Sequence, residues 1–447
     1  MKDSSAQLIE KNQTMIFNYS KNTFDLLRFG LAMCLAAFAL IGCKDKDDEK
    51  PVIQVASFIP GSALIGDTVT ITGNNFSTDK VKNLVLFGNY PAEVISATTT
   101  ELKVIVPTEC SSGKINIKID GHDAVTSAEE FIVNHLYIAG TVFTRKNTGI
   151  AMYWKNGVES LLTDSSSNQA YSESIFIANN DIYVGGYEFE NGVPVAKYWK
   201  NGTEVSLTTG NRSAKIRSIY VENGNVYCAG DEHNGNNSIA TYWENSKEVP
   251  LVKDGDLSLA NSIFVSNGDV YVAGYERDKG DSLAAKYWKN GIEVALTDGT
   301  NTAAINSIYV ENRNVHAVGY EVQDSVPVAK YWKNDTEIIL ESSANSYATH
   351  IIVVNNDIYI AGYEYKNGVI VAKYWKNGIV TYLPGGTKST YATSIGVLNN
   401  KVYVSGYEAD VRTQVAKLWV NSKDITLTNS PKNSFANSLV IVPYRLP

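Results

Sequence analysis

Seven copies of one short pattern, a variant of Ala-Lys-Tyr-Trp-Lys-Asn-Gly, occur between Met152 and Val420. Each copy carries one tryptophan, and these are all the tryptophans in the chain: Trp154, Trp199, Trp243, Trp288, Trp332, Trp375 and Trp419. They recur every 43 to 45 residues. A fixed period of that length indicates one repeated supersecondary unit, and it fits the four strands of a β-propeller blade.

The turn residues within one repeat support four strands per blade. From Ser174 the text reads SIFIANN, DIYVGGYE, VAKYW and TEVSLT, with short Asn-Asp and Asn-Gly connections that are typical of tight hairpins. The domain opens on a second strand, at residues 135–140, and closes on a first strand near Leu439. We therefore expect the C-terminal strand to complete the N-terminal blade. The result is an all-β chain with a seven-bladed propeller at 135–447 and no free edge strand.

The second strand of each repeat carries a further likeness. Its Tyr-Val-Gly-Gly or Tyr-Val-Ala-Gly text, followed by an aromatic third strand, resembles kelch-type propellers. The paired glycines of that family are kept only as Gly185-Gly186, and its tryptophan spacing is not reproduced. The resemblance therefore implies a fold and no function.

The N-terminus has the features of an export signal. Residues 29–42 form an apolar run, preceded by Arg28, that is about half the length needed to span a membrane. The run ends in Leu40-Ile41-Gly42-Cys43, which resembles the lipobox of bacterial lipoproteins and implies a signal peptide at 1–42 with lipidation of Cys43. Because the region before the run is long, either Met1 or Met15 can be the start.

The residues after Cys43 read as a tether. The run Lys-Asp-Lys-Asp-Asp-Glu-Lys at 44–50 cannot pack into a core, so residues 43–50 are expected to be solvated. A lipid anchor would hold the protein on the membrane without a spanning helix. The acidic cluster resembles the signal that exports some lipoproteins to the outer face of the outer membrane; the alternative is a tether that faces the periplasm. Cys110 and Cys228 fall in different predicted domains, which argues against a structural disulfide.

Residues 51–133 predict a small sandwich. Short alternating runs such as 68–72 and 114–119, punctuated by Gly, Pro and Asn, are typical of such a fold. The Pro-Gly, Gly-Asp-Thr-Val-Thr-Ile-Thr-Gly and Asn-Phe elements resemble the IPT/TIG immunoglobulin-like domain. This resemblance implies a domain without catalytic residues, and we expect a spacer that is joined stiffly to the propeller through Asn134. The alternative is a ligand-binding role.

Two charged positions of the repeat vary together. The Glu that closes the second strand and the Lys before Tyr-Trp occur in the same copies: Glu188 with Lys197, Glu276 with Lys286, Glu321 with Lys330, Glu364 with Lys373, and Glu408 with Lys417. In the first copy Val142 and Met152 replace both. We predict cross-strand ion pairs with a structural role, because a partly buried charge needs a partner. The seven tryptophans are likewise predicted to pack between blades, with sugar stacking as the alternative.

Positions where one repeat departs from the others are the best pointers to a site. Asp231, Glu232 and His233 replace Tyr-Glu in one copy, His316 replaces a tyrosine, and His350 replaces a serine. These five residues are the candidate ligand rim, and Arg217 and Arg313 are also singular. No metal-binding, nucleophile or phosphate-loop motif occurs, so we assign no catalytic residue, no metal and no cofactor. The loops between second and third strands differ most, and we expect a ligand there or at the axial opening.

These observations favour a binding function. The net charge of -8 and the lack of a basic stretch after Cys43 argue against nucleic acid as a partner. We expect a non-catalytic surface lipoprotein that acts as a binding or scaffold module, with an extracellular glycan as the first ligand class and a partner protein as the second. The alternatives are a propeller enzyme, a glycan lyase or hydrolase, and a purely structural envelope protein.

Overall fold

The computed structural model describes residues 51–445 except 165–167, 253–255, 278–280, 341–344 and 429–432. The predicted signal peptide, Cys43 and the charged tether therefore lie outside the described residues. Within these described ranges, no helix is long and apolar enough to cross a membrane. The described chain is all-β apart from one short 3-10 helix, η1 (Lys80–Lys82).

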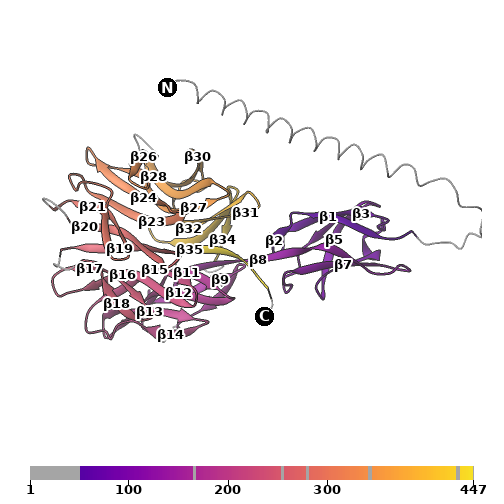
Figure 1. Ribbon diagram of the computed structural model, residues 1–447, viewed down its shortest axis with the longest axis horizontal. Coiled ribbons are helices and arrows are strands. Elements are labelled where there is room, and N and C mark those ends of the chain that lie inside the picture. The colour runs from indigo at the N-terminus through magenta and orange to yellow at the C-terminus, as the bar shows by residue number, and fades with distance from the viewer. Residues whose placement is uncertain are drawn as a thin grey trace, which may run out of the picture. The chain divides into compact units, whose positions relative to one another are not determined.

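The N-terminal part is a sandwich of β-strands (Figure 1). Residues along its inner strands alternate between core and solvent. Val69 and Ile71 are fully buried on one strand, and Leu102 and Val104 are fully buried on its neighbour. This period of two is what places one face of a strand in a core. The strands are β1 (Gln54–Ile59), β2 (Ser62–Leu64), β3 (Thr68–Asn74), β4 (Asn83–Phe87), β5 (Tyr90–Ala97), β6 (Glu101–Ile105) and β7 (Gly113–Ile119).

Six separate antiparallel sheets of four strands follow, each a meander in chain order (Figure 1). They are β11 (Ala170–Ala178), β12 (Asp181–Glu190), β13 (Val193–Lys200) and β14 (Thr203–Ser206); β15 (Ala214–Glu222), β16 (Asn225–His233), β17 (Ser238–Glu244) and β18 (Lys247–Pro250); β19 (Ser258–Ser266), β20 (Asp269–Arg277), β21 (Leu283–Lys289) and β22 (Ile292–Ala295); β23 (Ala303–Glu311), β24 (Asn314–Gln323), β25 (Val326–Lys333) and β26 (Thr336–Ile339); β27 (Asn345–Val354), β28 (Asp357–Lys366), β29 (Val369–Lys376) and β30 (Ile379–Tyr382); and β31 (Ser389–Leu398), β32 (Lys401–Ala409), β33 (Gln414–Val420) and β34 (Lys423–Thr426).

The predicted count of seven blades is not matched, because six sheets stand as separate blades. The strands expected to form the remaining blade are hydrogen-bonded in the order β35 (Ser434–Pro443), β8 (Val125–Phe143), β9 (Gly149–Lys155) and β10 (Val158–Leu161). They are part of an eleven-stranded sheet, since β8 also pairs with β7 of the sandwich. The physical reason is that Asn134, predicted to be a linker, lies inside β8, so the ladder has no break.

The predicted pairing of the two ends of the repeat region is confirmed. β35 runs antiparallel to β8, with Leu439 opposite Ile138 and Val440 opposite Tyr137. Both strands also contact the neighbouring sheets. Leu439 of β35 and Ile138 of β8 share a cluster with Tyr403, and Val440 of β35 and Tyr137 of β8 share another with Ala170. The C-terminal strand therefore closes the ring of strands around the axis.

The tryptophans lie at the contacts between sheets. Every one is at most 1% exposed, and each belongs to a different hydrophobic cluster. Trp243 of β17, for example, packs with Tyr183 and Ala196 of the preceding sheet. A large flat side chain against an alanine lets two twisted sheets approach closely, which explains why one tryptophan recurs in each repeat.

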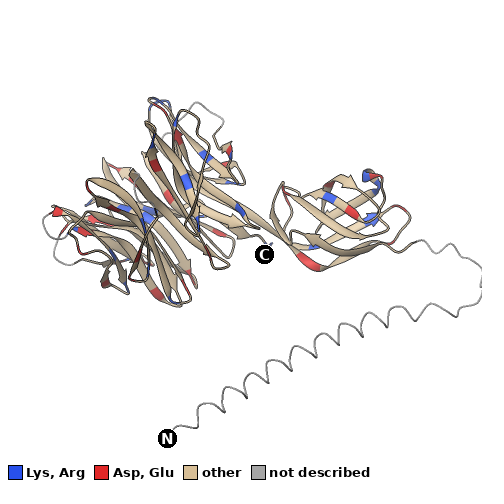
Figure 2. Cartoon of the chain, turned by 90° about the horizontal axis from the view of Figure 1, so that it is seen from above, with Lys and Arg blue, Asp and Glu red and all other residues tan. Residues whose placement is uncertain are grey.

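The predicted ion pairs are confirmed. The Lys Nζ to Glu carboxylate distance is 2.9 Å for Lys197 with Glu188, 2.9 Å for Lys286 with Glu276, and 2.8 Å for Lys330 with Glu321. Lys373 pairs with Glu364, and Lys417 lies 3.8 Å from Glu408. Basic and acidic positions are accordingly interspersed over the strands in Figure 2. The lysines are almost completely buried, so these pairs satisfy charges that the fold has removed from water.

Candidate functional site

The inner strands of the sheets enclose a cavity of about 510 Å³ around the axis. It is lined by β11, β15, β19, β23, β27 and β31 together with β35. A volume of this size lies within the range of small-molecule and sugar sites. The cavity is therefore the first candidate for a binding site.

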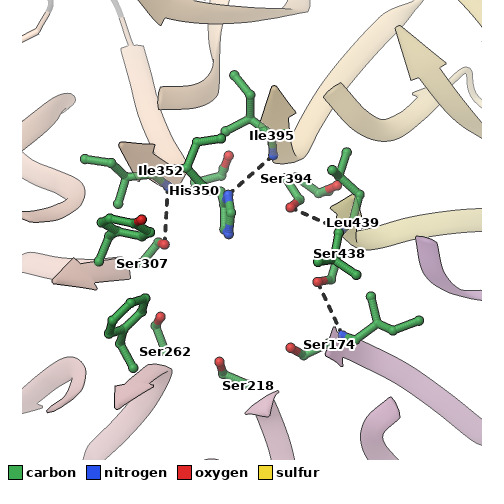
Figure 3. A pocket seen from close by; sticks show the side chains of 18 of the residues that line it. Ser174, Ser218, Ser262, Ser307, His350, Ile352, Ser394, Ile395, Ser438 and Leu439 are labelled. Atoms are coloured by element: carbon green, nitrogen blue, oxygen red, sulfur yellow. Dashed lines mark hydrogen bonds between the residues drawn. The ribbon is translucent and has the colours of Figure 1, made fainter. Parts of the chain in front are cut away.

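One layer of the cavity wall is a ring of six serines and one histidine (Figure 3). Each side chain accepts a hydrogen bond from a backbone N–H of the next inner strand, at 3.2 to 3.4 Å. The members are Ser174, Ser218, Ser262, Ser307, His350, Ser394 and Ser438. These bonds connect each inner strand to the next, so the ring fixes the width of the cavity.

A second layer is set by a β-bulge in each inner strand. The bulge between Ser172 and Ser174, for instance, leaves Glu173 without an opposite residue and turns it toward the cavity. The bulge positions are Glu173, Arg217, Asn261, Asn306, Thr349, Thr393 and Asn437. This layer therefore carries two charged side chains, on the adjacent strands β11 and β15, and five neutral ones.

The neutral bulge residues are held in place by hydrogen bonds. The amides of Asn261, Asn306 and Asn437 donate to backbone carbonyls of the next inner strand at 2.8 to 2.9 Å, and the hydroxyls of Thr349 and Thr393 do the same. A fixed amide keeps its carbonyl oxygen as an acceptor for a ligand hydroxyl. The cavity thus presents pre-oriented polar groups.

Aromatic rings cover one side of the cavity and one of its mouths. Phe176, Tyr220, Phe264 and Tyr309 form a row with centroid separations of 4.6 to 4.9 Å. A longer run of rings, here called the aromatic belt, lies toward the ends at which the inner strands begin. Its members contact one another in the order Tyr320, Tyr347, Tyr363, Tyr391, Tyr407, Phe435, Phe143, Tyr171, Tyr187 and Phe189.

The belt and the variable loops lie at the same end of the sheets. Ala170 at the start of β11 is opposite Glu188 near the end of β12, so the loop after Glu190 flanks this mouth. The sandwich contacts the other end, where the hairpin between β31 and β32 places Lys401 Nζ 2.7 Å from Asp67 and carries the Asn399 amide that donates to Ser62. The mouth with the aromatic belt is therefore free of the sandwich.

Asp231 is the predicted rim residue with the strongest interactions. It takes the place of a belt tyrosine and is 5% exposed. Arg217 Nε donates to its Oδ1 at 3.0 Å, and the Ser238 hydroxyl donates to its Oδ2 at 3.1 Å. The two singular residues Arg217 and Asp231 are therefore partners within one sheet.

Glu232 and His233 follow on the same strand but contact different surroundings. Glu232 Oε2 is buried and has no hydrogen-bond partner in the described part of the chain. Burial raises the pKa of this carboxyl, Glu248 raises it further, and Arg212 opposes the shift. His233 lies in a shallow pocket of about 370 Å³ between rim loops, with Pro194 and Arg212 among its neighbours.

The structure separates the two other predicted histidines. His350 belongs to the ring that lines the cavity (Figure 3). His316 lies outside the cavity, where it is buried with its Nδ1 2.8 Å from the Tyr331 hydroxyl. Burial lowers the pKa of each histidine to about 4, so both are neutral at pH 7. The five candidate rim residues thus do not converge on one point.

Sequence reasoning missed most of the cavity wall. Glu173 and the asparagines at the bulge positions were not singled out, although each directly precedes the repeated serine position. The belt tyrosines were missed because they come from two different positions of the repeat. A signal was available, since position 173 and its equivalents are polar in every copy. Throughout the described ranges, no group of three or more His, Cys, Asp or Glu side chains could hold a metal ion.

Comparison with known protein families finds a match for the sandwich alone. Residues 51–132 match the model of the IPT/TIG domain. The kelch-type character of the repeats remains a prediction, because this match covers the sandwich alone. No curated protein matches the chain.

Solved structures resemble the chain only distantly. An auxiliary nutrient binding protein from Bacteroides thetaiotaomicron is 13% identical with a TM-score of 0.35, covering 79% of this chain and 95% of that chain. An auxiliary nutrient binding protein from Bacteroides ovatus is 13% identical with a TM-score of 0.28, covering 84% of this chain and 86% of that one. A puromycin-hydrolyzing peptidase of Mycobacterium tuberculosis is 10% identical with a TM-score of 0.40, covering 56% of this chain and 44% of that one. Likeness at this level carries no functional argument.

Proposed function

We propose that this chain is a non-catalytic binding protein that takes the end of an extracellular glycan into the axial cavity. The observation that carries the proposal is the combination of the aromatic belt at one mouth with pre-oriented amides and hydroxyls inside. Aromatic faces stack on the apolar faces of sugar rings, while fixed polar groups pair with sugar hydroxyls. A folded partner protein would contact the rim without needing such a cavity.

The rim is also positioned for contact with a large ligand. The loops between second and third strands surround this mouth, and the sandwich contacts the opposite end of the sheets. Two of the distant structures above carry the name of nutrient binding proteins, but their likeness is too weak to add weight. The support for a glycan comes from the side chains of this chain.

Binding can be tested with the detergent-solubilised full chain on a glycan array, followed by calorimetry. Tyr407 stacks on Tyr391 at 4.6 Å and contacts Phe435 at 4.9 Å, so Tyr407→Ala should weaken binding about tenfold, whereas Tyr407→Phe, which keeps the ring, should not. Tyr382→Ala, on the outermost strand β30, is the matched control. Release of products from a bound glycan would contradict the non-catalytic assignment, and absence of binding to any glycan would contradict the ligand class.

The membrane address is proposed from the sequence. We infer that Cys43 is lipidated after removal of residues 1–42, and that the acidic tether directs the protein to the exterior face of the outer membrane. Mass spectrometry of the mature N-terminal peptide should find an acylated Cys43, and protease added to intact cells should cleave the protein. An unmodified Cys43, or full protection from the protease, would contradict the corresponding step.

We also propose that β35, β8, β9 and β10 serve as the seventh and closing blade of the propeller. Their antiparallel order and their contacts with the sheets on both sides support this role. Truncation after Leu427 removes β35 and exposes the edge of β8, so the cooperative unfolding transition should be lost. An unchanged transition would show that the ring does not depend on this blade.

A further inference from the structure

The two charged bulge residues make one wall of the cavity different from the rest. Glu173 on β11 and Arg217 on β15 occupy adjacent positions, and the same layer is neutral on every other inner strand. The neutral members use their donors on backbone carbonyls. Arg217 donates instead to Asp231, and the Glu173 carboxyl makes no hydrogen bond or ion pair in the described part of the chain. This wall therefore keeps charge available for a ligand.

Arg217 uses one of its three nitrogens on Asp231, which leaves the two terminal nitrogens for a ligand. Only Nε is used by Asp231, at 3.0 Å, and Asp231 itself is fixed by the Ser238 hydroxyl. The guanidinium has five N–H donors in a rigid fork, so its terminal nitrogens remain to bind two oxygens side by side. A carboxylate is the ligand group that matches this geometry.

The opposite wall supplies a neutral donor. His350 lies across the ring from Ser174 and Ser218 in Figure 3. Its Nδ1 accepts from the Ile395 backbone N–H at 3.4 Å, so the proton of the neutral ring is on Nε2. A ligand that spans the cavity would meet the Arg217 fork on one side and this N–H on the other.

The charges around Arg217 favour an anion. Lys215 Nζ lies 5.0 Å from the centroid of the Tyr187 ring, and both Lys215 and Arg217 act electrostatically on Glu173, while Asp231 is already engaged. Burial raises the pKa of Glu173, because its carboxyl borders the cavity deep inside the ring, although Arg217 and Lys215 oppose the shift. The raised pKa favours the neutral form of this carboxyl, which reduces the negative charge beside Arg217.

We propose that the axial cavity selects a sugar that carries a carboxylate, a uronic acid, which Arg217 binds through its terminal nitrogens. This assignment rests on the proposed glycan function and names the ligand class of the same cavity. Glu173, on the adjacent inner strand, hydrogen-bonds to a hydroxyl of the same sugar. Asp231 is a positioning residue, because it acts by orienting Arg217.

The test compares glucuronate with glucose by calorimetry on the full chain at pH 6. Glucuronate should bind at least tenfold more tightly than glucose, and Arg217→Gln should remove that preference by weakening glucuronate binding far more than glucose binding. Arg217→Lys keeps the charge but loses the fork, so it should restore only part of the preference. Arg212→Gln, at an exposed arginine of a rim loop, is the matched control and should change nothing.

The possible failures are distinguishable. Equal binding of the two sugars, with no effect of Arg217→Gln, would overturn the uronate assignment and leave a neutral glycan as the ligand. Preferential binding of glucosamine would also overturn it, because an ammonium group would pair with Glu173. No binding of glucose, glucuronate or any glycan on the array would overturn both this inference and the proposed function.

The pH dependence gives an independent readout of Glu173. Because its pKa is raised, Glu173 loses its proton at a higher pH than a free carboxyl does, and the resulting charge repels the ligand carboxylate. Affinity for glucuronate should therefore fall as pH rises. Glu173→Gln should flatten this profile, and a profile unchanged in the variant would contradict the role. The charged and titratable groups that face Glu173 are Arg217, Lys215, Tyr171, Tyr187 and Asp231.

Discussion

The sheets β23–β26 and β15–β18 have the same strand order and register, but they differ in a few side chains. Both place an acidic residue at the end of the second strand, Glu321 in one and Glu232 in the other. In β23–β26 a buried lysine, Lys330, pairs with it. In β15–β18 the lysine position holds Thr241, opposite Gly230 as Lys330 is opposite Gly319.

This comparison separates residues that build the ring from residues that can bind. The repeated residues satisfy one another within their own sheet. The sheet β15–β18, which keeps the glutamate but lacks the repeated lysine, also holds Lys215, Arg217 and Asp231, and Arg217 lines the cavity. Four of the singular residues, Arg217, Asp231, Glu232 and His233, therefore lie in this one sheet, and experiments can test whether they are functional or only tolerated.

The largest effect is expected from breaking the pair in β23–β26. Lys330 is fully buried, so Lys330→Met leaves Glu321 without its partner and should lower the free energy of unfolding by about 3–5 kcal/mol. Adding Glu321→Val should restore most of the loss, because no buried charge then remains unpaired; Glu337, the other partner of Lys330, is partly exposed to water. β8 and β9 already hold Val142 and Met152 at these two positions, both buried. Denaturant unfolding of the three variants measures the coupling, and purely additive losses would contradict the pairing.

A smaller effect is expected from supplying the missing lysine. Thr241→Lys should pair with Glu232, and with Glu248 as Lys330 pairs with Glu337, and should raise the free energy of unfolding by about 2 kcal/mol. The raised pKa of Glu232 means that its ionisation opposes folding as pH rises, so the gain should be larger at pH 7 than at pH 4. Thr241→Met is the matched control, and a gain of equal size in that variant would show that burial of apolar surface, not the pair, is responsible.

The features that recur in several copies of the repeat could be predicted from the sequence. The strand order, the ion pairs and the tryptophan contacts follow from positions such as Glu321 and Lys330, whose residue types recur together in most copies. The separation into blades was predicted incorrectly at one place, because Asn134 reads as a linker although β8 continues through it. The cavity wall could not be predicted, because a bulge makes Glu173 and Ser174 both line the cavity, and an alternating pattern assigns consecutive residues to opposite faces.

The smallest effect tests a departure that lies outside the cavity. His316 takes the place of a tyrosine that occurs in most repeats, such as Tyr271 and Tyr359, and is 4% exposed. Burial lowers its pKa in the folded state to about 4, below the value of about 6.5 in an unfolded chain, so its contribution to stability is lost as pH falls from about 6.5 toward 4. His316→Tyr should therefore reduce the loss of unfolding free energy between pH 7 and pH 5 by about 1 kcal/mol relative to the unaltered chain.

His233→Tyr, at the rim, should leave that loss unchanged and serves as the control. Glucuronate binding should not change in His316→Tyr, because His316 lies outside the cavity. If binding fell as it should in Arg217→Gln, the ligand would not distinguish the wall around Arg217 from the other departures from the repeat.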